Sequence, residues 1–206
     1  MNTVLLINAS PHGQVSHANR LALELVACLR HRHPGLELVE RDLGTDPLPP
    51  LNMDYARALT TATPFDSPAF EVSEALIGEL EHSDILLIAT PMHNFSLPAA
   101  LKLWIDYVLR IHRTFSSSPE GKAGLLNDRP VYVLVGSGGF HRGERARQPD
   151  FLTSYLRHAL NTVGLFNLHF TYLQGLVRGE EAVRATVEDS RNRLSLEPLF
   201  DNLVCA

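Results

Sequence analysis

The stretch ILLIATPMHNFSLPAALKLWIDYV, residues 85–108, decides which fold this sequence predicts. It begins with an apolar run, Ile85 to Ala89, of the kind that forms a strand buried on both faces of a parallel sheet. It ends with a helix whose buried face is predicted from apolar residues at helical spacing, namely Leu101, Trp104, Ile105 and Val108. We expect Ser96 to cap this helix and Pro98 to lie in its first turn. The polar loop in the middle therefore joins a buried strand to a helix.

The same unit of strand, loop and helix recurs along the chain in both directions. Apolar runs predict further strands at residues 4–7, 36–39, 131–135 and 165–173, and helical patterns occupy residues 21–29, 70–80, 151–163 and 179–194. Gly164 is the predicted end of the helix over 151–163. Five alternating strands and helices predict an α/β fold, a three-layer sandwich around a five-stranded parallel sheet of order 2-1-3-4-5. The six-stranded dinucleotide-binding fold needs a longer chain.

Two segments fall outside this pattern. SSSPEGKAG, residues 116–124, is predicted to be a loop, and residues 55–68 could form a short helix, a lid or a mobile excursion. No repeat, low-complexity tract or linker divides the sequence. We therefore expect residues 1–206 to form one domain.

Composition argues against several classes of protein. The net charge is −5, so no basic surplus is available to neutralise nucleic-acid phosphates. No apolar stretch reaches membrane-spanning length, and the N-terminus has no signal-peptide pattern, which makes the cytoplasm the default location. Cys28 and Cys205 have no metal-like spacing. The ten histidines form no ligand pair with the spacing of a zinc site, so no metal is predicted.

Three loops of unusual composition follow the first, third and fourth predicted strands. They are NASPHGQVSHAN at residues 8–19, TPMHNFSLP at 90–98 and GSGGFHRG at 136–143. In doubly wound sheets, ligands bind beyond the carboxyl ends of the strands, at the point where the winding reverses. The order 2-1-3-4-5 places that point between the first and third strands. We therefore expect the three loops to converge on a ligand site.

The side chains in these loops suggest what the ligand is. Ser10, Ser16 and Asn19 surround the start of a helix, whose free N–H groups favour an anion, and no phosphate-loop lysine motif is present. A single terminal phosphate fits this set. Met92 and Asn94 would suit the face and the edge of a planar heteroaromatic ring.

Simpler readings of the same residues stay open. Ser16 could be an ordinary helix cap, and Met92 and Phe95 could cap the core. The glycine-rich stretch GSGG, which would allow the backbone close to a flat ligand, could equally be a tight turn.

Several motifs together resemble one known family. SPHGQVSHAN, RDL after the second strand, PMHNFSLPAALKLWID, TF followed by GL, and GGFH are similar to the FMN-dependent NADH azoreductases, also described as NADH:quinone oxidoreductases, of flavodoxin-like fold. The resemblance implies FMN as the cofactor, NADH or NADPH as the electron donor, a quinone or azo compound as the substrate, ping-pong kinetics, and a homodimer with the flavin at the subunit junction.

The resemblance also implies roles for individual positions. The cofactor-binding set would be Ser10, Ser16, His17, Ala18 and Asn19 around the phosphate, Pro91, Met92, His93, Asn94 and Phe95 against the ring, and Gly136, Ser137, Gly138 and Gly139 at its other edge. No catalytic side chain is required, although His93 or His141 could pass a proton to the acceptor.

The sequence departs from the family pattern at several positions. Ala18 stands where a second serine is frequent, His93 where tyrosine is common, His112 where glycine is usual, and Gly136-Ser137 where the family has Ser-Arg. Two other functions remain as alternatives. One is a flavodoxin-like electron carrier that does not oxidise NADH itself, and the other is a serine hydrolase built around Ser137.

Overall fold

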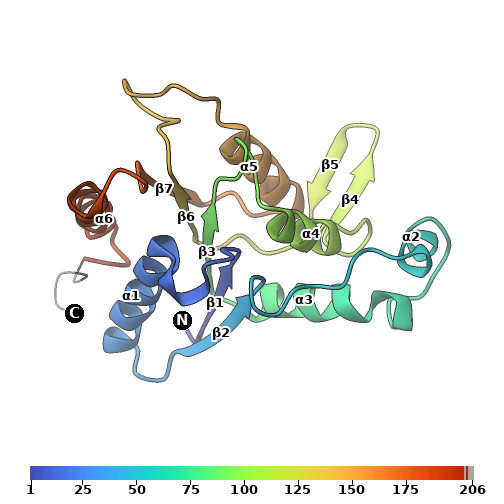
Figure 1. Cartoon of the computed structure of the whole chain (residues 1–206). Coiled ribbons are helices and arrows are strands. Elements are labelled where there is room, and N and C mark those ends of the chain that lie inside the picture. Colours follow the sequence, from blue (N-terminus) through green and yellow to red (C-terminus); the bar gives the residue numbers. More distant parts are fainter. Residues whose placement is uncertain (202, 204–206) are drawn as a thin grey trace.

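The computed structural model describes residues 1–201 and 203, so Cys205 lies outside the described residues. Figure 1 shows the elements in chain order, which are β1 (Thr3–Asn8), η1 (Gly13–Val15), α1 (His17–Arg32), β2 (Glu37–Asp42), α2 (Met53–Leu59), η2 (Pro68–Phe70), α3 (Glu71–His82), β3 (Ile85–Pro91), α4 (Ala99–Val108), β4 (Phe115–Ser118), β5 (Gly121–Gly124), β6 (Val131–Ser137), α5 (Phe151–Val163), β7 (Leu168–Gln174) and α6 (Glu180–Leu194).

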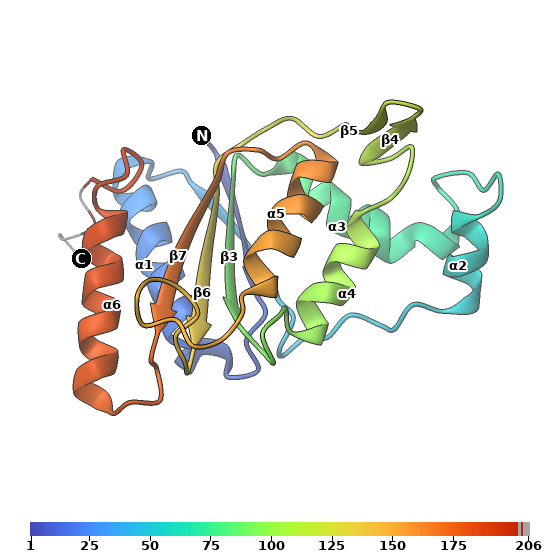
Figure 2. The ribbon, with the colours of Figure 1, turned by 90° about the horizontal axis from the view of Figure 1, so that it is seen from above.

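The central sheet has five parallel strands in the order β2-β1-β3-β6-β7. This is the predicted order 2-1-3-4-5, because β6 and β7 are the fourth and fifth strands of the sheet. Helices α1 and α6 cover one face, and α3, α4 and α5 cover the other, as Figures 1 and 2 show. The predicted α/β sandwich of three layers is therefore confirmed.

Two hydrophobic cores lie on the two sides of the sheet, because successive residues of a strand point to opposite faces. Leu6 and Leu87 pack under α1 and α6, whereas Leu5 and Leu86 pack under α3, α4 and α5. Both faces are dry, and this explains why the strands are continuous apolar runs in the sequence. Cys28 is buried in the α1 side as a free thiol.

The predicted helix boundaries are confirmed at one site and wrong at another. Gly164 ends α5 in the left-handed conformation, with φ 108°. Ser96 does not cap α4, which begins at Ala99 after Pro98. Instead, the backbone N–H and carbonyl of Ser96 pair with those of His93. Ser96 is the last residue of a turn that begins at His93, and α4 starts only after this turn.

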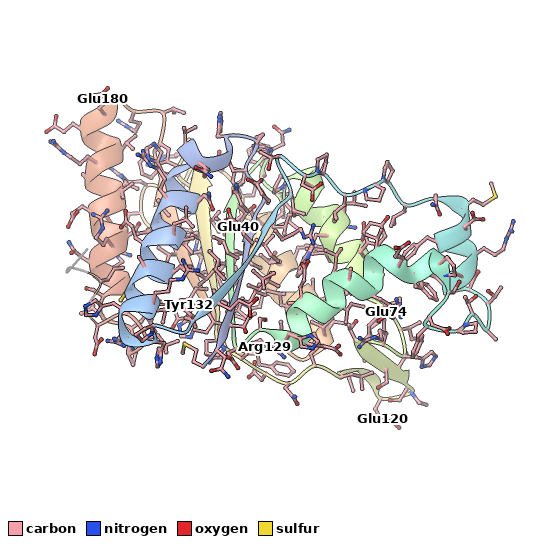
Figure 3. The ribbon with its side chains drawn as sticks, turned by 90° about the horizontal axis from the view of Figure 1, so that it is seen from below. Glu40, Glu74, Glu120, Arg129, Tyr132 and Glu180 are labelled. Carbon is pink, nitrogen blue, oxygen red and sulfur yellow. The ribbon has the colours of Figure 1, made fainter. Side chains whose placement is uncertain are left out.

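The predicted loop at 116–124 is also wrong, because β4 and β5 form an antiparallel hairpin there. Figure 3 shows Glu120 at the tip of this hairpin and Glu180, at the beginning of α6, at the other end of the molecule. A side chain at Gly124 would lie 2.2 Å from the backbone nitrogen of Gly164. The hairpin is therefore held directly against the end of α5, a contact that the local sequence does not reveal.

Residues 55–68, left open by the sequence, begin inside the short helix α2 and end at the helical turn η2. Arg110, which is 1% exposed, contacts this segment through Phe65, whose ring centroid lies 5.2 Å from the guanidinium carbon. The guanidinium of Arg110 pairs with Glu74, lies 3.0 Å from the hydroxyl of Ser73, and stacks over the ring of Phe70. The neighbouring His112 has φ 65°, a left-handed conformation that explains why glycine is usual at this position.

Among the described residues, no helix combines the length and the apolar character that crossing a bilayer requires. Where the protein resides in the cell stays a prediction.

Candidate functional site

The three predicted loops converge at the carboxyl edge of the sheet. Figure 2 shows the connections that follow β1, β3 and β6 gathered at one end of the strands. They enclose a cavity of about 380 Å³. The lining residues are Ser10, His12, Val15, Ser16, His17, Ala18, Thr90, Pro91, Met92, His93, Gly136, Ser137, Gly138, Leu176 and Val177. We call this space the edge cavity.

One end of the edge cavity lies at the N-terminus of α1. The hydroxyl of Ser16 accepts a bond from the backbone N–H of Asn19 at 3.5 Å, so the reading of Ser16 as a helix cap is correct. The N–H groups of His17 and Ala18 lie in the first turn and have no partner within the helix. Together with the helix dipole, these donors favour an anion.

Ser10 lies at the same end of the cavity and is held by the loop around it. Its backbone N–H donates to the side chain of Asn8 at 3.1 Å, and its hydroxyl accepts from the N–H of His12 at 3.3 Å. A side chain at Gly44 would lie 2.5 Å from the carbonyl oxygen of Ser10. The RDLG stretch at the end of β2 therefore supports the first loop at a place where only glycine fits.

The other end of the cavity is formed by the loops after β3 and β6. Met92 is 9% exposed, and its N–H donates to the carbonyl of Gly136 at 2.8 Å. Side chains placed on Gly136 and Gly138 would lie 3.3 Å from Leu176 and 3.1 Å from Val177. The two glycines therefore leave room for Leu176 and Val177, and we call the space that these residues line together with Met92 the slot.

A tight turn presents the residues that follow Met92. Asn94 and Phe95 have φ 46° and φ 71°, and the N–H groups of His93 and Ser96 donate to each other's carbonyls at 3.0 and 2.9 Å. Left-handed conformations at both central residues define a type I′ turn, which is strained for a phenylalanine. Such strain, next to a cavity, is typical of a functional site.

Not every predicted residue lines the cavity. Asn19 is fully buried inside α1, and neither polar atom of its side chain has a partner. Asn94 and Phe95 are exposed on the turn beside it. Gly139 packs against Gln148, and His141 is buried behind Ser137. These five residues support the cavity or flank it.

The pair Ser137 and His141 does not have the geometry of an activated nucleophile. The hydroxyl of Ser137 donates to the carbonyl of Gly139 at 2.9 Å, so it accepts from Nδ1 of His141 at 3.2 Å. Nε2 of His141 is buried without a partner, whereas a catalytic triad would orient this ring through a carboxylate. Burial lowers the pKa of His141, which favours the neutral form of the ring.

Sequence reasoning missed the fourth wall of the cavity, Leu176 and Val177. They lie in the loop after β7, between Gly175 with φ 79° and Gly179 with φ 93°. The N–H of Leu176 donates to the carbonyl of Ser137 at 3.0 Å. The sequence did contain a signal for this wall, because Gly175 and Gly179 follow the fifth strand at the same edge of the sheet.

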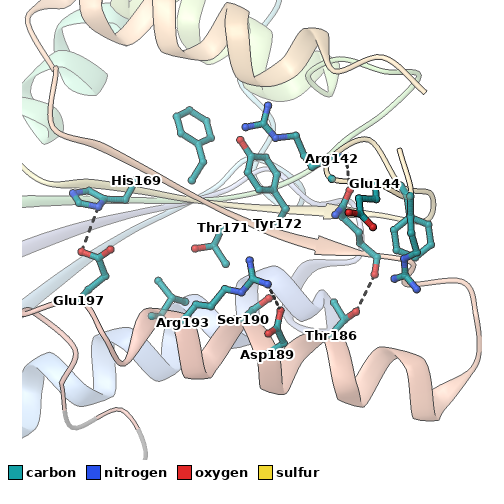
Figure 4. Close-up of a pocket in the computed structure, with 16 residues that line it drawn as sticks. Arg142, Glu144, His169, Thr171, Tyr172, Thr186, Asp189, Ser190, Arg193 and Glu197 are labelled. Carbon is teal, nitrogen blue, oxygen red and sulfur yellow. Dashed lines mark hydrogen bonds and ion pairs between the residues drawn. The ribbon is translucent and has the colours of Figure 1, made fainter. Parts of the chain in front are cut away.

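A second cavity, of about 580 Å³, lies along β7 and contains none of the predicted site residues (Figure 4). Two pairs of its charged groups lie close together. Arg193 pairs with Asp189 at 3.0 Å, and His169 lies 3.4 Å from Glu197. Gln174 accepts from the backbone N–H of His141 at 2.8 Å. This β7 cavity is larger than the edge cavity, but its lining includes the carboxylates of Glu144, Asp189 and Glu197, which disfavour an anion.

The residues of the edge cavity fit FMN. A single phosphate would meet hydroxyls and N–H groups at the start of α1, and none of the lining residues is a carboxylate that would repel it. The slot between Met92 and the glycines suits a flat ring.

Comparisons with known proteins agree with this fit. The profile of the family described as flavodoxin-like fold matches residues 2–196. The chain is 78% identical over 206 residues to FMN-dependent NADH:quinone oxidoreductase 4 of Pseudomonas fluorescens, with 100% of both chains covered. It is 54% identical over 185 residues to FMN-dependent NADH:quinone oxidoreductase 5 of Burkholderia lata, which covers 90% of this chain and 91% of that protein.

A solved structure supports the fold. The FMN-dependent NADH-azoreductase of Bacillus anthracis, in complex with FMN, superposes with a TM-score of 0.78 at 21% identity and covers 95% of this chain and 98% of that one. The suspected resemblance is confirmed by the two relatives above. The chain belongs to the family of FMN-dependent NADH:quinone oxidoreductases with a flavodoxin-like fold.

Proposed function

We propose that this protein is an FMN-dependent NADH:quinone oxidoreductase that also reduces aromatic azo compounds. The observation that carries the proposal is the edge cavity, in which uncharged donors lie at one end and a narrow apolar slot lies at the other. The family relationship supports the same activity.

Each end of the cavity has its own task in this proposal. Ser10, Ser16 and the N–H groups of His17 and Ala18 hold the phosphate. Met92 packs against the ring, and Asn94 with the turn from Gly136 to Gly139 donates to the ring's polar edge. Bound FMN would supply the redox chemistry, the transfer of two electrons from the nicotinamide to the acceptor.

A side chain that hands a proton to the reduced acceptor must reach the cavity. His93 is exposed and lines it, whereas His141 is only 5% exposed and lies behind Ser137. Of the two candidates, His93 is therefore better placed. In His93→Ala, we expect a lower kcat with an unchanged affinity for FMN. Unchanged kcat would remove His93 from the reaction.

The first test is the visible spectrum of the purified protein after incubation with FMN. We expect a yellow protein whose flavin band bleaches when NADH is added without oxygen and returns when a quinone is added. Initial rates should give parallel double-reciprocal lines, because both substrates would use one site in turn. A protein that stays colourless contradicts the proposal. Very slow bleaching by NADH would favour an electron carrier.

We further propose that the protein acts as a homodimer. Three exposed aromatic side chains lie near the rim of the edge cavity, Phe95, Phe151 and Tyr155, and the N–H of Phe151 bonds to the carbonyl of Phe95 at 3.0 Å. Exposed apolar side chains grouped in this way are typical of an interface. Light scattering should give twice the chain mass, and Phe151→Glu should give the mass of one chain. Phe166→Glu, at an exposed phenylalanine beyond α5, is the matched control.

A further inference from the structure

An apolar groove continues the edge cavity along α6, and no role has been assigned to it so far. Its volume is about 780 Å³. The residues that line it are His17, Leu176, Val177, Gly179, Glu180, Glu181, Val183, Arg184, Val187, Glu188 and Arg191. Three of them, His17, Leu176 and Val177, also line the edge cavity. The two spaces therefore meet over one loop and the first residue of α1.

The loop at this junction displays an apolar side chain. Val177 is 80% exposed, although its backbone is held on both sides. The N–H of Leu176 donates to Ser137, and the N–H of Arg178 donates to the carbonyl of Gly175 at 3.1 Å. A side chain on Gly175 would lie 2.9 Å from the ring of Phe140. Val177 is therefore presented outward by a braced turn, at the border between the two spaces.

The far end of the groove is closed by ion pairs between α6 and α1. Arg191 donates to both carboxylate oxygens of Glu24, at 2.8 and 3.1 Å, and also pairs with Glu188. Figures 1 and 2 show α1 and α6 side by side on this face of the sheet. These ion pairs therefore lie at one end of the groove, and the edge cavity adjoins the groove at the other.

The character of the groove indicates its occupant. Leu176, Val177, Val183 and Val187 make its apolar surface. Three carboxylates, those of Glu180, Glu181 and Glu188, stand against the two guanidinium groups of Arg184 and Arg191. This balance disfavours a diphosphate, which would need a surplus of cations. An uncharged hydrocarbon chain suits the surface, because its burial is favourable in proportion to its apolar area.

We propose that the groove binds the hydrocarbon side chain of a quinone acceptor whose ring stacks on the flavin at the mouth of the edge cavity. The inference rests on the proposed function, and it names the residues that would determine which quinones the enzyme prefers. Val183 and Val187, one turn apart on α6, would contact the chain, and Val177 would guide it out of the edge cavity.

The test compares two quinones with the same ring, one carrying a decyl chain and one carrying a methyl group in its place. Their dissociation constants for the FMN-loaded protein are measured by calorimetry without NADH. We expect the decyl compound to bind about tenfold more tightly to the wild type, and Val183→Asn to remove most of that preference. Ala185→Asn, at an exposed position of the same helix outside the groove, should keep it.

Equal affinities of the wild type for the two quinones would overturn the proposal, as would an equal preference in Val183→Asn and the wild type. If Val183→Asn changed the KM for NADH but left the dissociation constant of the decyl quinone unchanged, the groove would be assigned to the nucleotide. Because binding is measured without turnover, the result is independent of activity. Absence of NADH-driven reduction of the methyl compound would count against the proposed function alone.

Discussion

The edge cavity and the β7 cavity differ in how far their polar groups are satisfied. In the β7 cavity, Arg193 and Asp189 pair with each other, as do His169 and Glu197. In the edge cavity, the N–H groups at the start of α1 point into a space without any carboxylate. The edge cavity therefore offers backbone donors without a competing carboxylate, whereas acidic and basic side chains line the β7 cavity together. Donors without carboxylates indicate an anion site better than volume does.

The largest expected effect comes from filling the slot of the edge cavity. Gly138→Leu should weaken FMN binding by about 100-fold, because a side chain there meets Val177 and takes the space of the ring. The dissociation constant is measured by quenching of flavin fluorescence. Thr171→Leu places the same side chain in the β7 cavity and should leave FMN affinity unchanged. Equal losses in the two variants would refute the contrast between the cavities.

A smaller effect is expected from removing one donor at the phosphate end. Ser10→Ala should weaken FMN binding by about tenfold, since a hydrogen bond to a charged group contributes about 1.5–3 kcal/mol. Riboflavin, which lacks the phosphate, should bind equally to the variant and the wild type. A parallel loss for riboflavin would show that Ser10 acts on the ring or only on the fold. In the β7 cavity, Arg193→Ala serves as the control with unchanged FMN affinity.

His141 lies between the two cavities and should make stability depend on pH. Its ring contacts Ser137 on the edge-cavity side and the ring of Tyr172 on the β7 side. Burial lowers its pKa in the folded chain, so below about pH 6.5 the unfolded chain binds a proton that the folded chain does not. The stabilisation from neutral His141 is therefore fully present above that pH and is lost as the pH falls.

Urea unfolding between about pH 8 and about pH 5.5 measures this dependence. His141→Gln should lose less stability on acidification than the wild type does. His158→Gln, at an exposed position of α5, should keep the wild-type pH slope. If the free energy of unfolding of His141→Gln had the same pH dependence as that of the wild type, groups other than His141 would cause the loss of stability in acid.

The smallest effect concerns a departure from the family pattern. Ala18 lines the edge cavity in the first turn of α1, where a serine hydroxyl would add one donor for the phosphate. Ala18→Ser should tighten FMN binding by about threefold, a fraction of the 0.5–1.5 kcal/mol of a typical hydrogen bond, because Ala18 is closely packed. Ala27→Ser, on the exposed side of the same helix, is the control and should bind FMN as the wild type does. An unchanged affinity in Ala18→Ser would mean that the site is already saturated with donors.

The order of the strands and the position of the site could be predicted because they follow from local patterns. Continuous apolar runs such as Ile85 to Ala89 indicate strands that are covered on both faces, and alternating strands and helices leave few topologies open. Once the order 2-1-3-4-5 is set, the loops after β1 and β3 must meet. The residues in those loops, from Ser10 to Asn19 and from Pro91 to Phe95, then became candidates before any contact was known.

Other features depend on contacts between distant segments, and only the tertiary structure decided them. The hairpin β4–β5 packs against the end of α5 through Gly124 and Gly164, and the loop that supplies the fourth wall of the edge cavity bonds to Ser137 through Leu176. The same holds for Asn19 and His141, which the sequence placed at the ligand but which lie buried behind the surface. Periodicity in a sequence reports burial along one element, whereas the lining of a cavity depends on which atoms of separate elements approach one another.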